Sequence, residues 1–599
     1  MAKILTLHSP AQARRHYDAK TWQSETMYGL LVRHAAERGN RFACRDAGTR
    51  LTWSQMLIWV DAVASALHQA GLCEGDRVSV WLPSRVESIV VFLACSRNGY
   101  ICNPSLHQNY TVAEIETLLS RIDCRALIAQ MNYGADSDQF DIFERALANP
   151  TMRVVFALSG RLGAANSEGA TAAAGSGDLP LGVVAFPTLA GLTESTGSWG
   201  AKVASNVTSS VEPDTQPNTH PNTHPIIPPI ADPDKLVYLA FTSGTTGPPK
   251  GVMHSDNTLL ANGRAMVADW SHDDSTVLLS LSPMSHHIGT VALEQTMVCG
   301  CELVVHDPRL GRSALDWILE TGATYVMGVP THAMDLLHGL QQRGMNQLGQ
   351  VRVFYMAGAP IPQETAQRFV AIGVTPQNVY GMTENGSHQY TLPGDPTDVI
   401  VKTCGRACHG YEIALWSQEN ADIPAAPGEI GEIGGRGAVL MLGYFANQQT
   451  TERSFNASGW FMSGDLGQLD ERGNLHIVGR KKDLIIRGGH NIYPAQIEDL
   501  AHRHPAVKKA AAFAVADERL GEKVCLALIV EGPALGAEEL LEHLAQSGLS
   551  KFDMPEYYLV MDEFPLTPSG KILKRELMAW TQAGRIQPHP VRYKAKSVS

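Results

Sequence analysis

The residues best suited to chemistry form one run, rich in glycine and hydroxyl groups, directly after an apolar segment that ends at Phe241. Its members are Thr242, Ser243, Gly244, Thr245, Thr246, Gly247, Lys250 and Gly251. Glycines let the backbone turn its N–H groups toward an anion, while the hydroxyls add donors and the lysine adds a charge. The run therefore predicts a phosphate-binding loop. It is not a Walker A loop, because two prolines precede the lysine and a glycine follows it.

Six further motifs follow this loop along the chain. They are Pro283–Gly289 with His286, Ala357-Gly358-Ala359-Pro360, Tyr380-Gly381-Met382-Thr383-Glu384, Trp460–Asp465, Gly479–Asp483 with Arg480, and Pro565–Lys571. Together with the loop, they resemble in order the motifs of the adenylate-forming superfamily, which comprises acyl-CoA synthetases, peptide-synthetase adenylation domains and beetle luciferases. The resemblance covers most of the chain. Departures from the family pattern are Ser285, Ser463, His490 and Gln496.

The resemblance implies a role for each motif in activating a carboxylic acid with ATP. Its ATP-binding residues are the loop together with Gly358, Ala359, Pro360, Tyr380, Gly381, Met382, Asp465 and Arg480. In this assignment Tyr380 stacks on adenine, Asp465 and Arg480 bind the ribose, and Thr383 contacts phosphate. Glu384 binds Mg²⁺, and Lys571 lies between the carboxylate and the α-phosphate. Such cations are what the chemistry needs, because a carboxylate that attacks a phosphate brings two anions together.

The same resemblance implies a second step with a different arrangement of the chain. Asp483 is assigned as a hinge about which a small C-terminal domain turns after adenylation. The turn withdraws Lys571 and brings Gly488 and Gly489 to the site, where they let the pantetheine arm of coenzyme A pass. His286 is assigned to the acyl pocket, where it can approach the thiol. Arg264 is the one fixed cation in the windows that resemble the acyl pocket, and we expect it to face solvent.

The function that follows is that of an AMP-forming acyl-CoA synthetase using ATP, Mg²⁺ and coenzyme A. Medium-chain, alicyclic and aromatic carboxylic acids all remain open as substrates. One alternative is an adenylating enzyme that loads a carrier protein, although no carrier domain is evident after Lys571. Another alternative is an inactive nucleotide-binding protein that acts by interaction, but it has no chemical need for both Glu384 and Lys571.

The amino-acid composition restricts the classes of molecule that the protein is expected to bind. The 599 residues carry 48 Lys and Arg against 60 Asp and Glu, a formal charge of −12, which argues against a nucleic-acid partner. The ten cysteines include no Cys-x-x-Cys pair, and neither a signal peptide nor a stretch of about 18 apolar residues is present. We therefore expect a cytoplasmic protein without a transmembrane segment, and a homodimer stays open.

The periodicity of the chain predicts an α/β fold. From about Asp76, short β-branched runs alternate with amphipathic segments of helix length, which favours layered sheets built from βα units. Strands are predicted at 78–82, 236–241, 277–281, 302–306, 324–329 and 351–356, and a helix at 86–97. After about Val399, short glycine-rich strands such as 429–434 and 439–443 predict a small antiparallel β-barrel.

The predicted domains follow from these changes of pattern. Residues 1–479 form a large N-terminal domain, with a β-barrel subdomain at about 400–478. Residues 480–599 form a small, mobile α+β C-terminal domain. Between about 160 and 232 the chain is dominated by Ala, Gly, Ser, Thr and Pro, and such a segment buries too little apolar surface to offset its ordering entropy. We therefore predict a mobile insert there.

Overall fold

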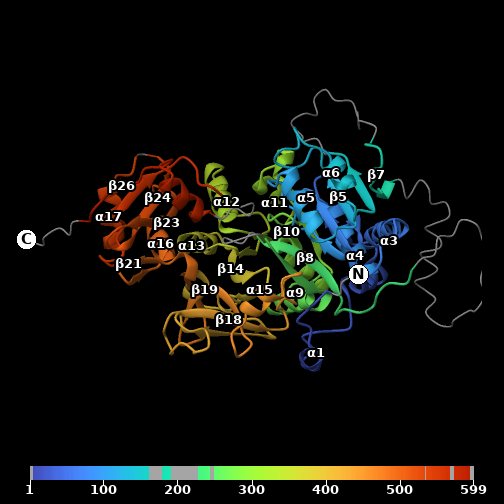
Figure 1. Cartoon of the computed structure of the whole chain (residues 1–599), viewed down its shortest axis with the longest axis horizontal. Helices are drawn as coiled ribbons and strands as arrows, with labels where there is room; N and C mark the ends of the chain where they lie inside the picture. The colour runs from blue at the N-terminus through green and yellow to red at the C-terminus, as the bar shows by residue number, and fades with distance from the viewer. Residues whose placement is uncertain are drawn as a thin grey trace, which may run out of the picture.

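The computed structural model describes residues 4–160, 179–190, 227–242, 249–359, 361–532, 534–566 and 572–593. Over these residues the N-terminal part contains two large sheets (Figure 1). The first has the strand order β7-β6-β5-β3-β4-β8-β9, and all of its neighbours are parallel except β8 and β9. The second has the order β16-β15-β14-β13-β12-β10-β11-β1-β2 and is parallel from β14 to β1. The α/β class predicted from the periodicity is confirmed.

The strands of these sheets are short and mostly buried, as expected for sheets covered on both faces. The first sheet comprises β3 (Arg77–Trp81), β4 (Ile101–Asn103), β5 (Ala126–Gln130), β6 (Val154–Leu158), β7 (Val184–Ala185), β8 (Leu236–Thr242) and β9 (Lys250–Ser255). The second comprises β1 (Phe42–Arg45), β2 (Arg50–Thr52), β10 (Val277–Ser280), β11 (Glu302–Val305), β12 (Tyr325–Gly328), β13 (Val353–Met356), β14 (Thr375–Met382), β15 (Gly386–Tyr390) and β16 (Arg406–Ala407).

Helices α9 (Asp256–Trp270) and α10 (His287–Cys299) contact strands of both sheets. The other helices of this part are α1 (Pro10–Asp18), α2 (Met27–Arg38), α3 (Trp53–Gln69), α4 (Val86–Asn98), α5 (Val112–Arg121), α6 (Ile142–Ala148), α11 (Ala314–Thr321), α12 (Pro330–Gln342), α13 (Gln363–Ala371), α14 (Thr397–Lys402) and α15 (Gln448–Arg453). One continuous hydrophobic core includes Val78 of the first sheet, Leu278 of the second and Leu260 of α9. No helix of the described chain is both long and apolar enough to cross a bilayer.

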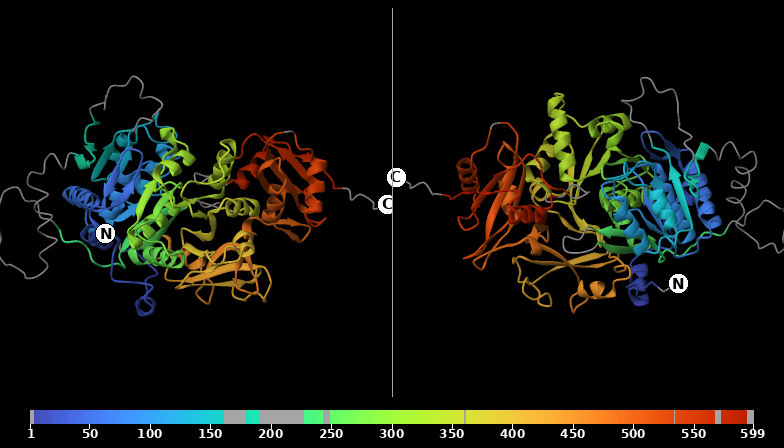
Figure 2. Two further views of the ribbon diagram at one scale, coloured as in Figure 1. Left: turned by 180° about the vertical axis from the view of Figure 1, so that it is seen from behind. Right: turned by 45° about the horizontal axis from the view of Figure 1, so that its top comes forward.

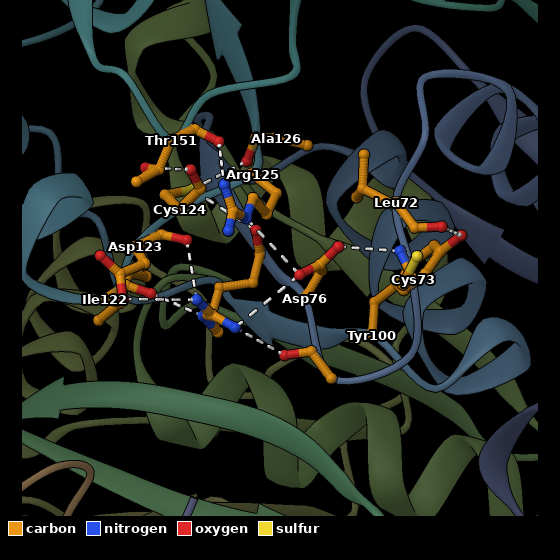
Figure 3. A network of polar contacts seen from close by, with 12 residues as sticks. Leu72, Cys73, Asp76, Tyr100, Ile122, Asp123, Cys124, Arg125, Ala126 and Thr151 are labelled. Carbon is orange, nitrogen blue, oxygen red and sulfur yellow. Dashed lines mark hydrogen bonds and ion pairs between the residues drawn. The ribbon is translucent and has the colours of Figure 1, made fainter. Parts of the chain in front are cut away.

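The amino ends of β3 and β5 are tied together by a polar network (Figure 3). The Arg77 guanidinium donates to the backbone oxygens of Ile122 at 2.6 Å and Asp123 at 3.0 Å. Asp76 accepts from the Cys73 N–H at 2.8 Å, and the side chain of Arg125 lies 3.7 Å from its carboxylate. Because open α/β sheets bind ligands at the carboxyl ends of their strands, this network braces the opposite edge.

Two smaller sheets follow (Figure 2). The first is antiparallel, with the order β17 (Tyr411–Trp416), β18 (Gly431–Gly437), β19 (Phe461–Leu469) and β20 (Leu475–Arg480). The second belongs to the red C-terminal region at one end of the molecule and contains β21 (Ile485–Arg487), β22 (His490–Ile492), β23 (Val507–Asp517), β24 (Gly521–Val530), β25 (Tyr557–Val560) and β26 (His589–Pro590). Its helices are α16 (Pro494–His502), α17 (Ala537–Gln546) and α18 (Lys574–Gln582). A large N-terminal domain of layered sheets followed by a small α+β domain is thus confirmed.

The strand predicted at 439–443 is wrong. The chain there forms no regular strand but runs beside β9, where the Leu442 N–H donates to the Met253 oxygen at 2.8 Å and the Phe445 N–H to the Gly251 oxygen at 2.7 Å. Gly443 adopts a φ of 105°, which interrupts the extended conformation. The alternation of apolar residues therefore predicted a strand of the small antiparallel sheet, whereas the segment packs on β9 of the first large sheet.

Part of the predicted insert is folded. Residues 179–190 contribute the edge strand β7, and Phe186 is only 4% exposed. Its ring lies 6.4 Å from the Trp59 ring and 6.1 Å from the Phe156 ring, centroid to centroid, and the Trp59 indole donates to the Pro187 oxygen at 2.6 Å. The composition of the segment did not predict this contact, because only two apolar residues of the stretch 179–190, Val183 and Phe186, are buried. The stretches 161–178 and 191–226 lie outside the described residues.

We expect Phe186→Ala to lower the free energy of unfolding by about 3 kcal/mol, because it removes a buried ring and leaves a cavity between Trp59 and Phe156. The measurement is urea denaturation followed by tryptophan fluorescence. Phe140→Ala is the control, since Phe140 is 49% exposed and its loss should cost less than about 0.5 kcal/mol. Equal denaturation midpoints for the two variants would show that residues 179–190 do not stabilise the sheet.

Candidate active site

The predicted phosphate-binding loop connects two strands that pair as an antiparallel hairpin. Thr242 ends β8, Lys250 begins β9, and the two residues are opposite one another in the register. Ser243, Gly244, Thr245, Thr246 and Gly247 lie outside the described residues. β4 and β8 are parallel, so the loop leaves the first sheet at the carboxyl end of β8. This is the edge at which open α/β sheets bind ligands.

Lys250 and Glu384 meet through an aromatic ring. The Lys250 ammonium lies 4.7 Å from the centre of the Tyr444 ring, and the Tyr444 hydroxyl donates to a Glu384 carboxylate oxygen at 2.9 Å. Burial raises the pKa of Glu384, while Tyr444 and the charges of Lys250 and Arg480 act in the opposite direction. The structure therefore brings together two residues that are 134 positions apart in the sequence.

Asp465 and Arg480 form an ion pair across neighbouring strands. They are opposite one another in the β19–β20 register, with an Arg480 nitrogen 3.0 Å from an Asp465 oxygen. The other Asp465 oxygen accepts from the Tyr380 hydroxyl at 2.9 Å. Asp465 is the main cause of the raised pKa of Arg480, and burial followed by Asp465 raises the pKa of Tyr380. The pair lies within the small antiparallel sheet, and the Tyr380 hydroxyl links Asp465 to β14 of the second large sheet.

Thr383 is fixed by a buried histidine from the first sheet. The His254 Nε2 lies 2.7 Å from the Thr383 backbone oxygen, and its ring stacks on that of His287 at 5.8 Å. Burial lowers the pKa of His254 to about 4 and that of His287 well below its usual range, so both rings are neutral. His286, the residue before α10, caps that helix by accepting from the Ile288 N–H at 3.4 Å.

The predicted adenine-side loop follows β13 at the carboxyl end of the second sheet. Gly358 has a φ of 87°, which favours glycine, and Ala359 follows it, whereas Pro360 lies outside the described residues. Gly381 lies so close to β15 that a Cβ there would be 1.8 Å from the Gly386 oxygen. Met382 precedes Thr383, and its N–H donates to the Asn385 side chain at 3.0 Å.

The C-terminal residues are placed only in part. Asp483 ends a short 3₁₀ turn (Lys481–Asp483) that follows Arg480. Gly488 and Gly489, with φ of 58° and 85°, turn the hairpin between β21 and β22, a conformation that favours glycine at both positions. Lys571 lies outside the described residues.

The structure corrects the sequence analysis at Arg264 and extends it at Tyr444. Both terminal nitrogens of Arg264 are buried, so the expectation that this side chain faces solvent is wrong. The charges acting on it come from Glu25, Arg33, Asp256 and Tyr17, and burial lowers its pKa to about 10. Sequence reasoning also missed Tyr444, because it lies outside the seven motifs and its role depends on a contact between distant segments.

A model of the family described as AMP-binding enzyme matches residues 31–445, and one of the AMP-binding enzyme C-terminal domain matches residues 496–571. The chain belongs to the AMP-binding enzyme family. The resemblance drawn from seven motifs is thereby confirmed. The first match includes the Thr242–Lys250 hairpin and Glu384, and the second ends at Lys571.

Several relatives of known activity align over most of the chain. It is 28% identical over 530 residues to a medium-chain fatty-acid–CoA ligase of Escherichia coli (strain K12), covering 88% of this chain and 85% of the relative. It is 30% identical over 539 residues to a mitochondrial medium-chain acyl-CoA ligase of Homo sapiens, covering 88% and 82%. It is also 29% identical over 573 residues to a salicylyl-CoA synthase / salicylate adenylyltransferase of Streptomyces sp, covering 94% and 95%.

Solved structures agree with this assignment. ATP-bound MatB from Rhodopseudomonas palustris superposes with a TM-score of 0.74 at 25% identity, covering 93% of this chain and 99% of that one. An anthranilate CoA ligase in complex with anthranoyl-AMP shares the fold, with a TM-score of 0.77 at 20% identity and coverage of 95% and 99%. These likenesses extend over both the layered sheets and the C-terminal region.

Proposed function

We propose that this chain joins a carboxylic acid to coenzyme A in two steps. The acid first attacks the α-phosphate of ATP, so that an acyl-adenylate forms and pyrophosphate leaves. The thiol of coenzyme A then displaces AMP from the acyl carbon. The observation that carries this proposal is the convergence of Lys250, Glu384, Asp465 and Arg480, from four separate segments, beside the carboxyl ends of β8 and β14.

The Asp465–Arg480 pair suits the ribose of ATP. A carboxylate accepts from sugar hydroxyls, and Arg480 can donate to a ring or hydroxyl oxygen while staying paired. Asp465 is largely buried and already accepts from Tyr380, so its orientation is fixed before a ligand arrives. The same hydrogen bond fixes the orientation of the Tyr380 ring. We assign this ring to the adenine, together with Gly358, Ala359 and Pro360.

Glu384 fits a single protein ligand for Mg²⁺. Among the described residues, no three His, Cys, Asp or Glu side chains converge as a metal cage. Mg²⁺ commonly takes one or two carboxylates and completes its octahedron with phosphates and water, and so neutralises phosphate charge when bound. Tyr444 holds one oxygen of Glu384, which orients the carboxylate and leaves the other oxygen for the ion.

The remaining roles belong to residues of the loop and the C-terminal region. We assign Thr242, Thr383 and Lys250 to phosphate oxygens, and Lys571 to the space between the acid and the α-phosphate. Gly488 and Gly489 form a turn without side chains, which suits passage of the narrow pantetheine arm, with Asp483 as the hinge. His286 stands at the start of α10 and is assigned to the acyl side of the site.

The activities of the relatives point to medium-chain and aromatic acids. The Escherichia coli and Homo sapiens relatives are medium-chain ligases, and the Streptomyces relative takes salicylate. We therefore propose an acid of about this size, with coenzyme A as the acceptor.

The deciding experiment measures release of pyrophosphate and of AMP with a panel of straight-chain, cyclic and aromatic acids, each with and without coenzyme A. We expect acid-dependent pyrophosphate release in both conditions, and sustained AMP release only when coenzyme A is present. Pyrophosphate release without turnover on coenzyme A would favour a carrier protein as the acceptor. Binding of ATP without pyrophosphate release for any acid would contradict the proposal.

A further inference from the structure

Glu432 is a buried glutamate of β18, an inner strand of the small antiparallel sheet, and it lies outside the seven motifs. Its two carboxylate oxygens have different partners. One oxygen accepts from the Gly464 N–H at 3.2 Å, and the other accepts from the Lys481 ammonium at 2.8 Å. A buried carboxylate costs free energy unless it is paired, and these two donors provide the pairing.

Both donors are next to the proposed ribose-binding residues. Gly464 precedes Asp465 on β19. Lys481 follows Arg480, the last residue of β20. Asp465 and Arg480 pair across these two strands, so Glu432 contacts the backbone beside one member of the pair and the side chain beside the other. A single side chain of the third strand therefore connects the flanks of the ribose-binding pair.

The contact between Glu432 and Gly464 anchors a β-bulge that carries Asp465. Three residues of β19, 463–465, lie opposite one residue of β18. Gly464, the middle one, has a φ of 76°, in the left-handed region. A bulge of this kind bends the strand and changes the direction of its side chains. Because Glu432 holds the N–H at the centre of the bulge, it helps to fix the direction of the Asp465 side chain.

The contact between Glu432 and Lys481 anchors the end of β20. Lys481 is the first residue of the 3₁₀ turn that ends at the proposed hinge, Asp483. Its side chain is partly exposed, whereas the carboxylate that holds it is buried. The ion pair therefore attaches the beginning of the turn to the small sheet, and with it the backbone that carries Arg480.

We propose that Glu432 is a positioning residue for the ribose of ATP. It acts through Gly464 and Lys481, which hold the ribose-binding pair in the geometry that two sugar hydroxyls require. This inference rests on the proposed adenylation and adds a residue on which recognition of the nucleotide depends. Both oxygens of Glu432 are engaged in the structure, so its effect on the ribose passes through Asp465 and Arg480. A small displacement of such groups is enough to weaken their contacts strongly.

A purely structural role for Glu432 predicts a different result. If the ion pair only stabilised the small sheet, its loss would slow turnover with every nucleotide by the same factor. A positioning role instead lowers the preference for nucleotides that carry both ribose hydroxyls, because these hydroxyls are what the Asp465 carboxylate accepts from. Deoxynucleotides therefore separate the two roles.

The test compares kcat and KM for acid-dependent pyrophosphate release with ATP, 2′-deoxy-ATP and 3′-deoxy-ATP, at a saturating concentration of one acid. The proteins are the wild type, Glu432→Gln, Lys481→Met, the double variant and the control Glu412→Gln, whose exposed ion pair with Arg436 belongs to the same sheet. A site built to bond a hydroxyl rejects an analogue without it. We therefore expect the wild type to prefer ATP to at least one deoxy analogue by about 10-fold or more in kcat/KM.

Glu432→Gln should raise KM for ATP by about 10-fold with a much smaller change in kcat, because weaker ribose contacts affect bound substrate and transition state alike. Its preference for ATP over the deoxy analogue should fall accordingly. Lys481→Met should have a similar effect. Adding Glu432→Gln to Lys481→Met should cause no further loss, since both substitutions act through one contact. Glu412→Gln should match the wild type in all three nucleotides.

The outcomes remain distinguishable if one variant does not fold. Lys481→Met leaves a buried carboxylate without its cation, and if it is insoluble, Glu432→Gln and the double variant still decide. An unchanged preference for ATP in Glu432→Gln, or additive losses in the double variant, would overturn this inference alone. A wild type that does not distinguish ATP from either analogue would overturn it together with the ribose assignment of Asp465 and Arg480. Absence of pyrophosphate release with every acid would overturn the proposed function.

Discussion

Lys571→Ala is expected to abolish acid-dependent pyrophosphate release while sparing thioester formation from a supplied acyl-adenylate. A cation between the attacking carboxylate and the α-phosphate matters only while these two anions approach one another. At about 4 Å and an effective dielectric of about 20, one such pair is worth about 4 kcal/mol, or about a thousandfold in rate. The two half-reactions are measured separately, the first as pyrophosphate release and the second as acyl-CoA formed from synthetic acyl-adenylate.

The matched control is Lys402→Ala, which removes an exposed lysine at the end of α14. Both half-reactions should proceed at the wild-type rate in this variant. An equal loss of both half-reactions in Lys571→Ala would remove the role assigned to Lys571, because the second half-reaction starts from an adenylate that has already formed. Retention of full pyrophosphate release would do the same.

Glu384→Gln should lower kcat/KM for ATP by roughly 100-fold or more and raise the Mg²⁺ concentration needed for half-maximal activity. Glutamine keeps the shape and can still accept from Tyr444, so the change isolates the loss of charge. Tyr444→Phe provides a graded comparison. It keeps the ring over Lys250 and removes one charge-assisted hydrogen bond to Glu384, which should cost about 10-fold.

Initial rates over a matrix of ATP and Mg²⁺ concentrations would check this order of effects. Glu412→Gln is the control, since Glu412 pairs with Arg436 on the surface of β17–β18 and such pairs contribute little. A larger defect in Tyr444→Phe than in Glu384→Gln would contradict the assignment, because the hydroxyl is proposed to act only through the carboxylate. An unchanged Mg²⁺ requirement in Glu384→Gln would place the ion elsewhere.

The tests differ in what they can separate. Lys571 and Glu384 are proposed to act on ATP and on the carboxylate common to all substrates, so their variants should slow every acid alike.

The local sequence was sufficient to predict most of the strands and the type of reaction. Strand periodicity placed β8, β10 and β11 within a few residues, because short apolar runs of this kind leave few other conformations. Motifs such as Tyr380–Glu384 were sufficient to predict the family, because each contains its chemical groups within a few consecutive residues. The same local view failed at 439–443 and at Phe186, where packing against another sheet decides the conformation.

Only the tertiary structure decided which of these groups act together. Contacts between segments far apart in the chain make Tyr444 a hydrogen-bond partner of Glu384 and bury the guanidinium of Arg264. Glu294 is the sharpest case: on an amphipathic helix a glutamate is ordinarily a solvated residue, and α10 is instead buried between two sheets. Burial depends on which segments of the fold cover a residue, and for this reason the sequence predicted the adenylating groups but not the buried positions of Arg264 and Glu294.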